Sequence, residues 1–305
     1  EIDSFLKDAD TIGISGHVRP DGDCVGSTLA VYNYIKDYYP DKTVKLFLEP
    51  SPNIFKFMQR SDEIDNTFSY GRQFDLYIAL DCSDLGRLGS AAEFFKEAKR
   101  TICIDHHVTN GAFADENYIF PDASSTCELV YELLPKERLT MHIAECIYTG
   151  MVHDTGVFQY SSTSPETMRI AGELMKTGFN FSKIIDESFY QKTYVQNQVM
   201  GRVLAESIIL LDGKCIIGYL KKKDMDFYGV EGKDLDGIVS QLRLTEGVEV
   251  AMFLYELETQ SFKVSLRSNG KVDVSKIAVY FGGGGHMRAA GCDLQGSVYD
   301  VINNV

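Results

Sequence analysis

SGHVRPDGDCVGS, residues 15–27, places His17, Asp21 and Asp23 within seven residues of one another. The apolar run TIGISG (11–16) leads into this stretch and predicts a buried strand, while GSTLAVYNYIKDYY (26–39), which follows it, has helical spacing. Three explanations are open for such a polar turn: a metal site, a helix-capping turn with spare acid, or chance in an acidic chain.

The N-terminal part of the chain alternates apolar runs with helical patterns. TVKLFL (43–48), FDLYIALD (74–81) and TICIDHH (101–107) are rich in Ile, Leu and Val and have the length of buried strands. From residue 124 to residue 206 the chain is predicted to be mostly helical. The alternation of strands and helices favours an α/β fold with a parallel sheet flanked by helices.

The pattern changes in the last third of the sequence. SIILLDGKCIIGYL (207–220) is typical of a hairpin that turns at Asp212-Gly213, and VEVAMFLYEL (248–257) and SFKVSLRS (261–268) are two more predicted strands. We therefore predict an N-terminal α/β domain over 1–185, a connecting helix over 186–206, and a smaller α/β domain with a mixed sheet over 207–305.

Composition excludes some classes of function. The 305 residues carry a net charge of −14, which argues against binding to long duplex nucleic acid. Residues 1–190 hold 17 basic and 30 acidic residues, whereas residues 191–305 hold 13 and 14, so the excess acid lies in the first part. Clustered acid there suits a divalent metal, and the nearly neutral second part tolerates a phosphate.

The seven cysteines are scattered and include no CxxC pair, and most lie inside apolar runs. This usage favours buried, reduced thiols and a cytoplasmic protein without disulfides. No apolar run approaches the roughly 18 residues of a membrane-spanning helix, and no signal peptide is evident, so we expect no membrane partner.

The candidate site residues fall where predicted strands and helices end. Carboxyl ends of parallel strands share one rim of a sheet, where ligands of open α/β folds bind. The side chains at these ends are His17, Asp21, Asp23, Asp81, Asp105, His106, His107 and Asp154. Each motif alone is more typical of a turn or a helix cap. Because all of the motifs fall at the ends of predicted strands or helices, together they favour a metal site.

Imidazole and carboxylate ligands without thiolate suit Mn²⁺, and also Mg²⁺, Fe²⁺ or Zn²⁺. The set is larger than one ion needs, but it would serve two ions about 3.5–4 Å apart that share a carboxylate. Such a pair activates a water and neutralises charge on a phosphoryl group in an in-line displacement.

The second part has its own candidate motif, FGGGGHMRAAG (281–291). Glycines let backbone N–H groups approach an anion closely, and nearby basic side chains would complete a phosphate site; taken alone, the run also fits a flexible loop. The predicted substrate-binding residues are Arg267, Ser268, Gly283, Gly284, Gly285, His286 and Arg288.

Taken in order, HVRPDGD, ALDCSD, DHH and HDTGVF resemble the DHH phosphoesterase superfamily, and FGGGGHMRAAG resembles the signature of its DHHA1 domain. The resemblance covers nearly the whole chain. It is strongest to the stand-alone NrnA-type branch, the oligoribonucleases (nanoRNases) that also act as pAp phosphatases. It implies a DHH domain and a DHHA1 domain with an active-site cleft between them.

The resemblance also implies roles for single residues. His17, Asp21 and Asp81 would hold one metal ion, and Asp23, His106 and Asp154 would hold a second, with Asp81 bridging. His107 would face the scissile phosphate, and Asp105 would orient an imidazole. The seven substrate-binding residues of the second part would bind the nucleotide and its phosphate. The metal that the resemblance implies is Mn²⁺, with two ions in each active site.

The resemblance implies hydrolysis of short single-stranded RNA to mononucleotides and of pAp to AMP. Three alternatives are a phosphodiesterase for c-di-AMP or pApA, an inorganic pyrophosphatase, and a non-catalytic nucleotide-binding sensor. The glycine-rich motif disfavours the pyrophosphatase, and the complete ligand set disfavours the sensor. The sequence leaves a homodimer open.

Overall fold

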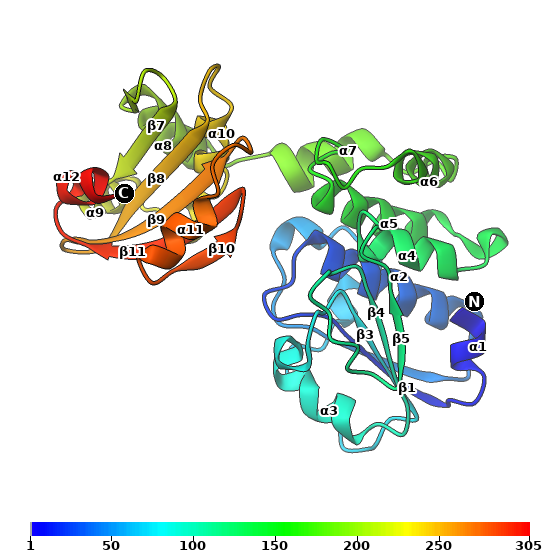
Figure 1. Cartoon of the computed structure of the whole chain (residues 1–305). Helices are drawn as coiled ribbons and strands as arrows, with labels where there is room; N and C mark the ends of the chain where they lie inside the picture. The colour runs from blue at the N-terminus through cyan, green and yellow to red at the C-terminus, as the bar shows by residue number, and fades with distance from the viewer. Residues whose placement is uncertain (1) are drawn as a thin grey trace. The chain divides into compact units, whose positions relative to one another are not determined.

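The computed structural model describes residues 2–305, which form two compact units that divide between Gln191 and Lys192 (Figure 1). Both units combine helices with a sheet, as the sequence predicts. Among the described residues, no helix has both the length and the apolar content needed to cross a membrane.

The first unit contains the predicted parallel sheet. Its five strands lie in the order β2 (Thr43–Phe47), β1 (Thr11–Ser15), β3 (Leu76–Leu80), β4 (Thr101–Asp105) and β5 (Glu116–Ile119), and all the pairings are parallel. The first four strands match the apolar runs of the sequence. The edge strand β5 was not predicted, because the segment ENYI is short, only partly buried and lacks an apolar run.

Helices cover both faces of this sheet. α2 (Gly22–Tyr38), α4 (Thr126–Leu133) and α5 (Met141–Asp154) pack together on one face, and α3 (Ala92–Glu97) packs on the other (Figure 1). Successive residues of a strand face the two sides of the sheet in turn. In β1, Ile12 and Ile14 pack in the core on the α2 side, whereas Gly13 lies against the ring of Tyr77 on the other side. A Cβ at Gly13 would lie 2.4 Å from that ring, so only glycine fits. The described part of the unit also contains the α-helices α1 (Ile2–Leu6), α6 (Pro165–Met175) and α7 (Phe181–Ile185), the π-helix η5 (Asp186–Tyr190) and several short 3-10 helices.

Asp75 joins the starts of two strands and gives a testable contribution to stability. Its carboxylate accepts hydrogen bonds from the backbone N–H and hydroxyl of Thr11, both at 2.9 Å, and from Lys99 Nζ at 2.7 Å. The Lys99 and Thr11 contacts hold the pKa of Asp75 below its ordinary value. We expect Asp75→Asn to lower the free energy of unfolding by about 1–2 kcal/mol at pH 7.

This contribution should depend on pH with a defined sign. Because the folded-state pKa lies below the unfolded one, the stabilisation is complete above about pH 4 and is lost as the pH falls through the folded-state pKa. Urea denaturation of both proteins should therefore give midpoints that converge in acid. Asp41→Asn, at an exposed aspartate, is the control; a difference that stayed constant with pH would contradict the charged role of Asp75.

The second unit contains the predicted mixed sheet. The strand order is β10 (Gly284–His286), β11 (Ala289–Gln295), β9 (Ser261–Ser268), β8 (Val250–Glu258), β7 (Cys215–Leu220) and β6 (Ile208–Leu210). β7 and β8 are parallel and the other pairs are antiparallel. The hairpin predicted at Asp212-Gly213 is confirmed: it joins β6 to β7, and Leu211, Asp212 and Gly213 all have positive φ.

The helices of the second unit form two cores with its sheet. α8 (Tyr194–Ala205), α9 (Lys222–Tyr228) and α10 (Ile238–Arg243) pack on one face, and α11 (Val274–Tyr280) and α12 (Val298–Asn304) on the other. The helix expected over 186–206 is divided in the structure into η5 and α8, with Thr193 and Gln196 forming a capping box that begins α8. Val199 and Val203 of α8 lie in the core of the second unit.

Candidate active site

The eight candidate site residues of the first part lie together at the carboxyl ends of β1, β3 and β4. These strands are direct neighbours in the sheet, so the residues after them share one rim. Asp154 reaches the same place as the last residue of α5, and Asp21 caps the start of α2. Asp21 thus fits both the capping and the metal-site explanations.

Asp81 lies at the centre of the cluster and is only 2% exposed. Its Oδ2 is 3.4 Å from His17 Nε2, and its Oδ1 is 3.8 Å from His106 Nε2 and 3.6 Å from His107 Nδ1. Its backbone is left-handed, with φ of 54°, a strained conformation that Asp and Asn tolerate better than most residues. One carboxylate therefore faces two groups of potential ligands.

Each group contains an imidazole and further carboxylates. On one side, His17 Nε2 lies 3.6 Å from Asp21 Oδ2. On the other, His106 Nε2 lies 2.9 Å from Asp154 Oδ2 and 3.9 Å from Asp23 Oδ2. The thiol of Cys24 also lies close to His17 and Asp81.

The two buried imidazoles have the orientation that metal ligands require. His17 donates from Nδ1 to the carbonyl of Val18 at 2.9 Å, and His106 donates from Nδ1 to the carbonyl of Ala123 at 3.3 Å. Both therefore turn Nε2 toward the carboxylates, as metal-bound histidines do when a backbone carbonyl holds their other nitrogen. Among the described residues, the buried Nε2 of His106 has no partner with hydrogen-bond geometry.

The charges of the cluster are those expected around a cation. Burial, reinforced by the charge of Asp81, raises the pKa of Asp23 to about 7, and burial beside Asp23 raises that of Asp154 to about 6. Burial opposes protonation of His17 and His106, but the neighbouring carboxylates outweigh it and raise both pKa values to about 10. Protons thus offset the mutual repulsion of the carboxylates, and a divalent cation would displace them. The donor set fits a hard or borderline divalent ion.

Thr126 and the N-terminus of α4 hold two of these carboxylates in place. Asp23 accepts hydrogen bonds from the backbone N–H groups of Thr126 at 2.7 Å and Cys127 at 2.9 Å, and the Thr126 hydroxyl donates to Asp81 Oδ1 at 3.2 Å. Thr126 is not among the site residues predicted from the sequence. Its only signal is the run SSTCE (124–128), which is typical of a helix start and carries no metal-binding pattern.

Thr126→Val should weaken binding of a divalent cation, with Mn²⁺ as the probe, by roughly tenfold, the low end of the range for outer partners of metal ligands. Valine keeps the shape and the backbone N–H that Asp23 uses but removes the hydroxyl that fixes Asp81. Isothermal titration calorimetry measures the change, and Thr126→Ser, which retains the hydroxyl, is the matched control. Equal Mn²⁺ affinities for the valine and serine variants would show that the hydroxyl does not position Asp81.

His107 belongs to a separate network at the rim. Its Nδ1 donates to Asp105 Oδ1 at 2.7 Å, and Asn110, which the sequence analysis also missed, donates to Asp105 Oδ2 at 2.7 Å. Burial opposes ionisation of Asp105, but these bonds outweigh it and keep the pKa of Asp105 low; the same contact raises the pKa of His107. The imidazole is held by a buried carboxylate while its side chain remains 41% exposed.

In the second unit, the strand register brings several predicted residues together. Arg267 of β9 and His286 of β10 both pair with Ala289 of β11, so they flank the same position of the sheet. The guanidinium of Arg288 packs on Gly270, where a Cβ would lie 3.0 Å from it. Ser268 differs from the others: it is 2% exposed, and its hydroxyl donates to Glu249 and accepts from the Gly270 N–H. Its hydroxyl therefore holds a turn.

The last two residues of the glycine run, Gly284 and Gly285, begin strand β10, and Gly283 directly precedes it. A Cβ at Gly283 would lie 2.1 Å from the carbonyl oxygen of Gly291, and one at Gly285 would lie 2.4 Å from Ala290 Cα. Gly285 also has φ of 143°. Close packing on β11 requires glycine at these two positions, whereas Gly284 has open space beside it.

Comparisons with known proteins agree with this architecture. The DHH family N-terminal domain matches residues 11–151, and the DHHA1 domain matches residues 212–304. A bifunctional oligoribonuclease and PAP phosphatase NrnA from Thermus thermophilus is 32% identical over 289 residues, which cover 93% of this chain and 84% of the relative. The protein of the same name from Bacillus subtilis is 29% identical, with coverages of 93% and 90%.

A solved structure extends the match to three dimensions. The crystal structure of an exopolyphosphatase-related protein from Bacteroides fragilis has a TM-score of 0.90 at 30% identity, and the match covers 99% of this chain and 92% of that one. The motifs, the fold and the relatives agree along nearly the whole length. The chain therefore belongs to the DHH family of phosphoesterases, which are metal-dependent hydrolases, and carries a DHHA1 domain in its second unit.

Proposed function

We propose that this enzyme uses Mn²⁺ to hydrolyse short oligoribonucleotides to mononucleotides and also removes the 3′-phosphate of pAp. The main support is the position of Asp81, whose two oxygens face separate imidazole–carboxylate groups. The names of the relatives from Thermus thermophilus and Bacillus subtilis support the substrate class. The free, mostly buried cysteines support a cytoplasmic enzyme.

In this proposal His17, Asp21 and Asp81 hold one ion, and Asp23, Asp81, His106 and Asp154 hold the other. Two bound ions would supply an activated water and neutralise charge on the phosphoryl group. Asp81 would contribute an oxygen to each ion, and the hydroxyl of Thr126 fixes its orientation. His107, held through Nδ1 by Asp105, presents Nε2 to a phosphoryl or leaving-group oxygen, where it donates a hydrogen bond.

We further propose that Arg267, His286 and Arg288 of the second unit bind the phosphate and nucleotide of the substrate. Arg267 and His286 flank one sheet position, and His286 and Arg288 are exposed. Gly284 leaves the backbone accessible beside them. A patch of two guanidiniums and an imidazole suits a phosphate group.

The test is hydrolysis of a labelled RNA trimer, a 24-mer, pAp and c-di-AMP side by side with added Mn²⁺. Rapid cleavage of the trimer, slow cleavage of the 24-mer and release of phosphate from pAp are expected. Turnover of c-di-AMP alone would replace the proposal with a cyclic-dinucleotide phosphodiesterase. Absence of turnover with all four substrates would refute it.

A further inference from the structure

His153, the residue before Asp154, fills the space between the candidate metal centre and the end of the first unit. Its ring packs on Gly22, which lies between Asp21 and Asp23: a Cβ at Gly22 would lie 2.3 Å from His153 Cγ. Any larger residue at position 22 would push α2 away from α5. The ring of His153 therefore sets the spacing between the aspartates that begin α2 and the aspartate that ends α5.

The other side of the ring is fixed by the segment that ends the first unit. His153 Nε2 lies 3.1 Å from Ser188 Oγ, and the Ser188 hydroxyl donates its hydrogen to the carbonyl of Ile184 at 2.6 Å. Because a hydroxyl has one hydrogen, His153 must be the donor to Ser188. Phe55 and Phe189 contact the ring edge-on, with centroids 5.0 and 5.5 Å away, so the imidazole is held from several sides.

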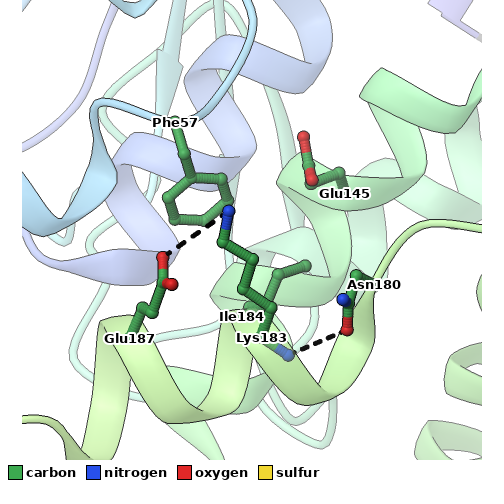
Figure 2. Close-up of a pocket in the computed structure, with 6 residues that line it drawn as sticks. All are labelled: Phe57, Glu145, Asn180, Lys183, Ile184 and Glu187. Atoms are coloured by element: carbon green, nitrogen blue, oxygen red, sulfur yellow. Dashed lines mark hydrogen bonds and ion pairs between the residues drawn. The ribbon is translucent and has the colours of Figure 1, made fainter.

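Ser188 is buried and belongs to the π-helix η5, which ends one residue before the boundary at Gln191. π-Helical turns are rare and are frequently found at functional sites. The wider turn of η5 places Ser188 so that one hydroxyl joins α7 to His153. The same segment is exposed on its outer side, where it lines a pocket of about 200 Å³ (Figure 2).

That pocket is not a second active site. It is formed by Phe57, Glu145, Asn180, Lys183, Ile184 and Glu187, and it contains none of the candidate ligands. Its volume is below the roughly 300 Å³ at which small-molecule sites begin. α7 and η5 thus have solvent on one side and the hydrogen bond to His153 on the other, and a change in their position acts on His153 directly.

We infer that His153 is a positioning residue that couples the candidate metal centre to residues 184–190, the segment leading into the second unit. Gly22 connects it to Asp21 and Asp23, the chain connects it to Asp154, and Ser188 connects it to η5. Since coupling is reciprocal, the position of this segment affects metal affinity and metal binding restrains the segment. The inference rests on the proposed function, because it requires the metal centre.

Ser188→Ala is the decisive variant, because it removes the acceptor for His153 and leaves the ring packed. We expect its Mn²⁺ affinity, measured by calorimetry, to fall on the order of fivefold to tenfold. Hydrogen–deuterium exchange of residues 184–190 should slow on addition of Mn²⁺ in the wild type, and this slowing should be lost in the variant. Ser207→Ala, which removes a comparable hydroxyl–carbonyl hydrogen bond in the second unit, should change neither result.

His153→Gln and His153→Leu separate hydrogen bonding from packing. Glutamine retains an amide donor for Ser188 and should keep part of the Mn²⁺-dependent slowing, whereas leucine should lose it. Unchanged Mn²⁺ affinity and unchanged slowing in Ser188→Ala would overturn the coupling while leaving the metal centre intact. Failure of the wild-type protein to bind Mn²⁺ would overturn the metal centre and the coupling together.

Discussion

Replacing Asp81 by asparagine is expected to lower the rate of hydrolysis of the RNA trimer by on the order of 10³-fold. A metal centre stabilises the transition state by several kcal/mol, and each loss of about 1.36 kcal/mol slows the reaction tenfold. Asp81 contributes an oxygen to both ligand groups, so the loss of its charge weakens both. Asparagine is the appropriate replacement, because it has the same shape and tolerates the left-handed backbone of this position.

The variant should fold normally, so a loss of hydrolysis would reflect the loss of the metal centre and not unfolding. Circular dichroism should be unchanged. We expect Mn²⁺ to raise the melting temperature of the wild type but not that of the variant, because a ligand stabilises only the state that binds it. Asp41→Asn, at an exposed aspartate, is the matched control and should retain both activity and the Mn²⁺ effect. Normal turnover by Asp81→Asn would refute the proposed centre.

The parts of the site that sequence predicts are those tied to strand ends. Asp81 and Asp105 come at the ends of short apolar runs, and neighbouring parallel strands bring such residues to one rim. The geometry of the contacts was beyond prediction, because it depends on helix positions. Thr126 contacts Asp81 only because α4 begins beside the end of β3, and nothing in the pattern of residues 124–128 indicates this neighbour.

In the second unit the sequence reveals a motif but not its structural role. Four glycines in a row fit either an anion-binding loop or a flexible one. The structure shows that Gly283 and Gly285 pack closely on β11, the next strand along the chain. The residue pattern alone does not distinguish this close strand pairing from a loop. Ser268 is similar: its position beside Arg267 indicates a binding role, but its hydroxyl donates a hydrogen bond to Glu249, 19 residues earlier in the chain. No local pattern reveals this contact.

His107→Gln is expected to reduce kcat by on the order of 10²–10³-fold, the usual cost of removing one donor to a developing oxyanion. His107 is 41% exposed, compared with 5% for His17 and 16% for His106, and its Nδ1 is engaged by Asp105. Its Nε2 is thus the imidazole nitrogen best placed for substrate. Because His107 is not among the proposed ligands, Mn²⁺ affinity should be retained, and exposed His142→Gln is the control.

The network around His107 allows a sharper test than one substitution. Asp105→Asn should also lower kcat, because a neutral amide no longer stabilises the protonated imidazole that donates from both Nδ1 and Nε2. If Asp105 acts through His107, the double variant should be little worse than His107→Gln alone, since residues of one network do not contribute additively. Fully additive losses would show that Asp105 acts independently. A raised KM with unchanged kcat in His107→Gln would restrict His107 to substrate binding.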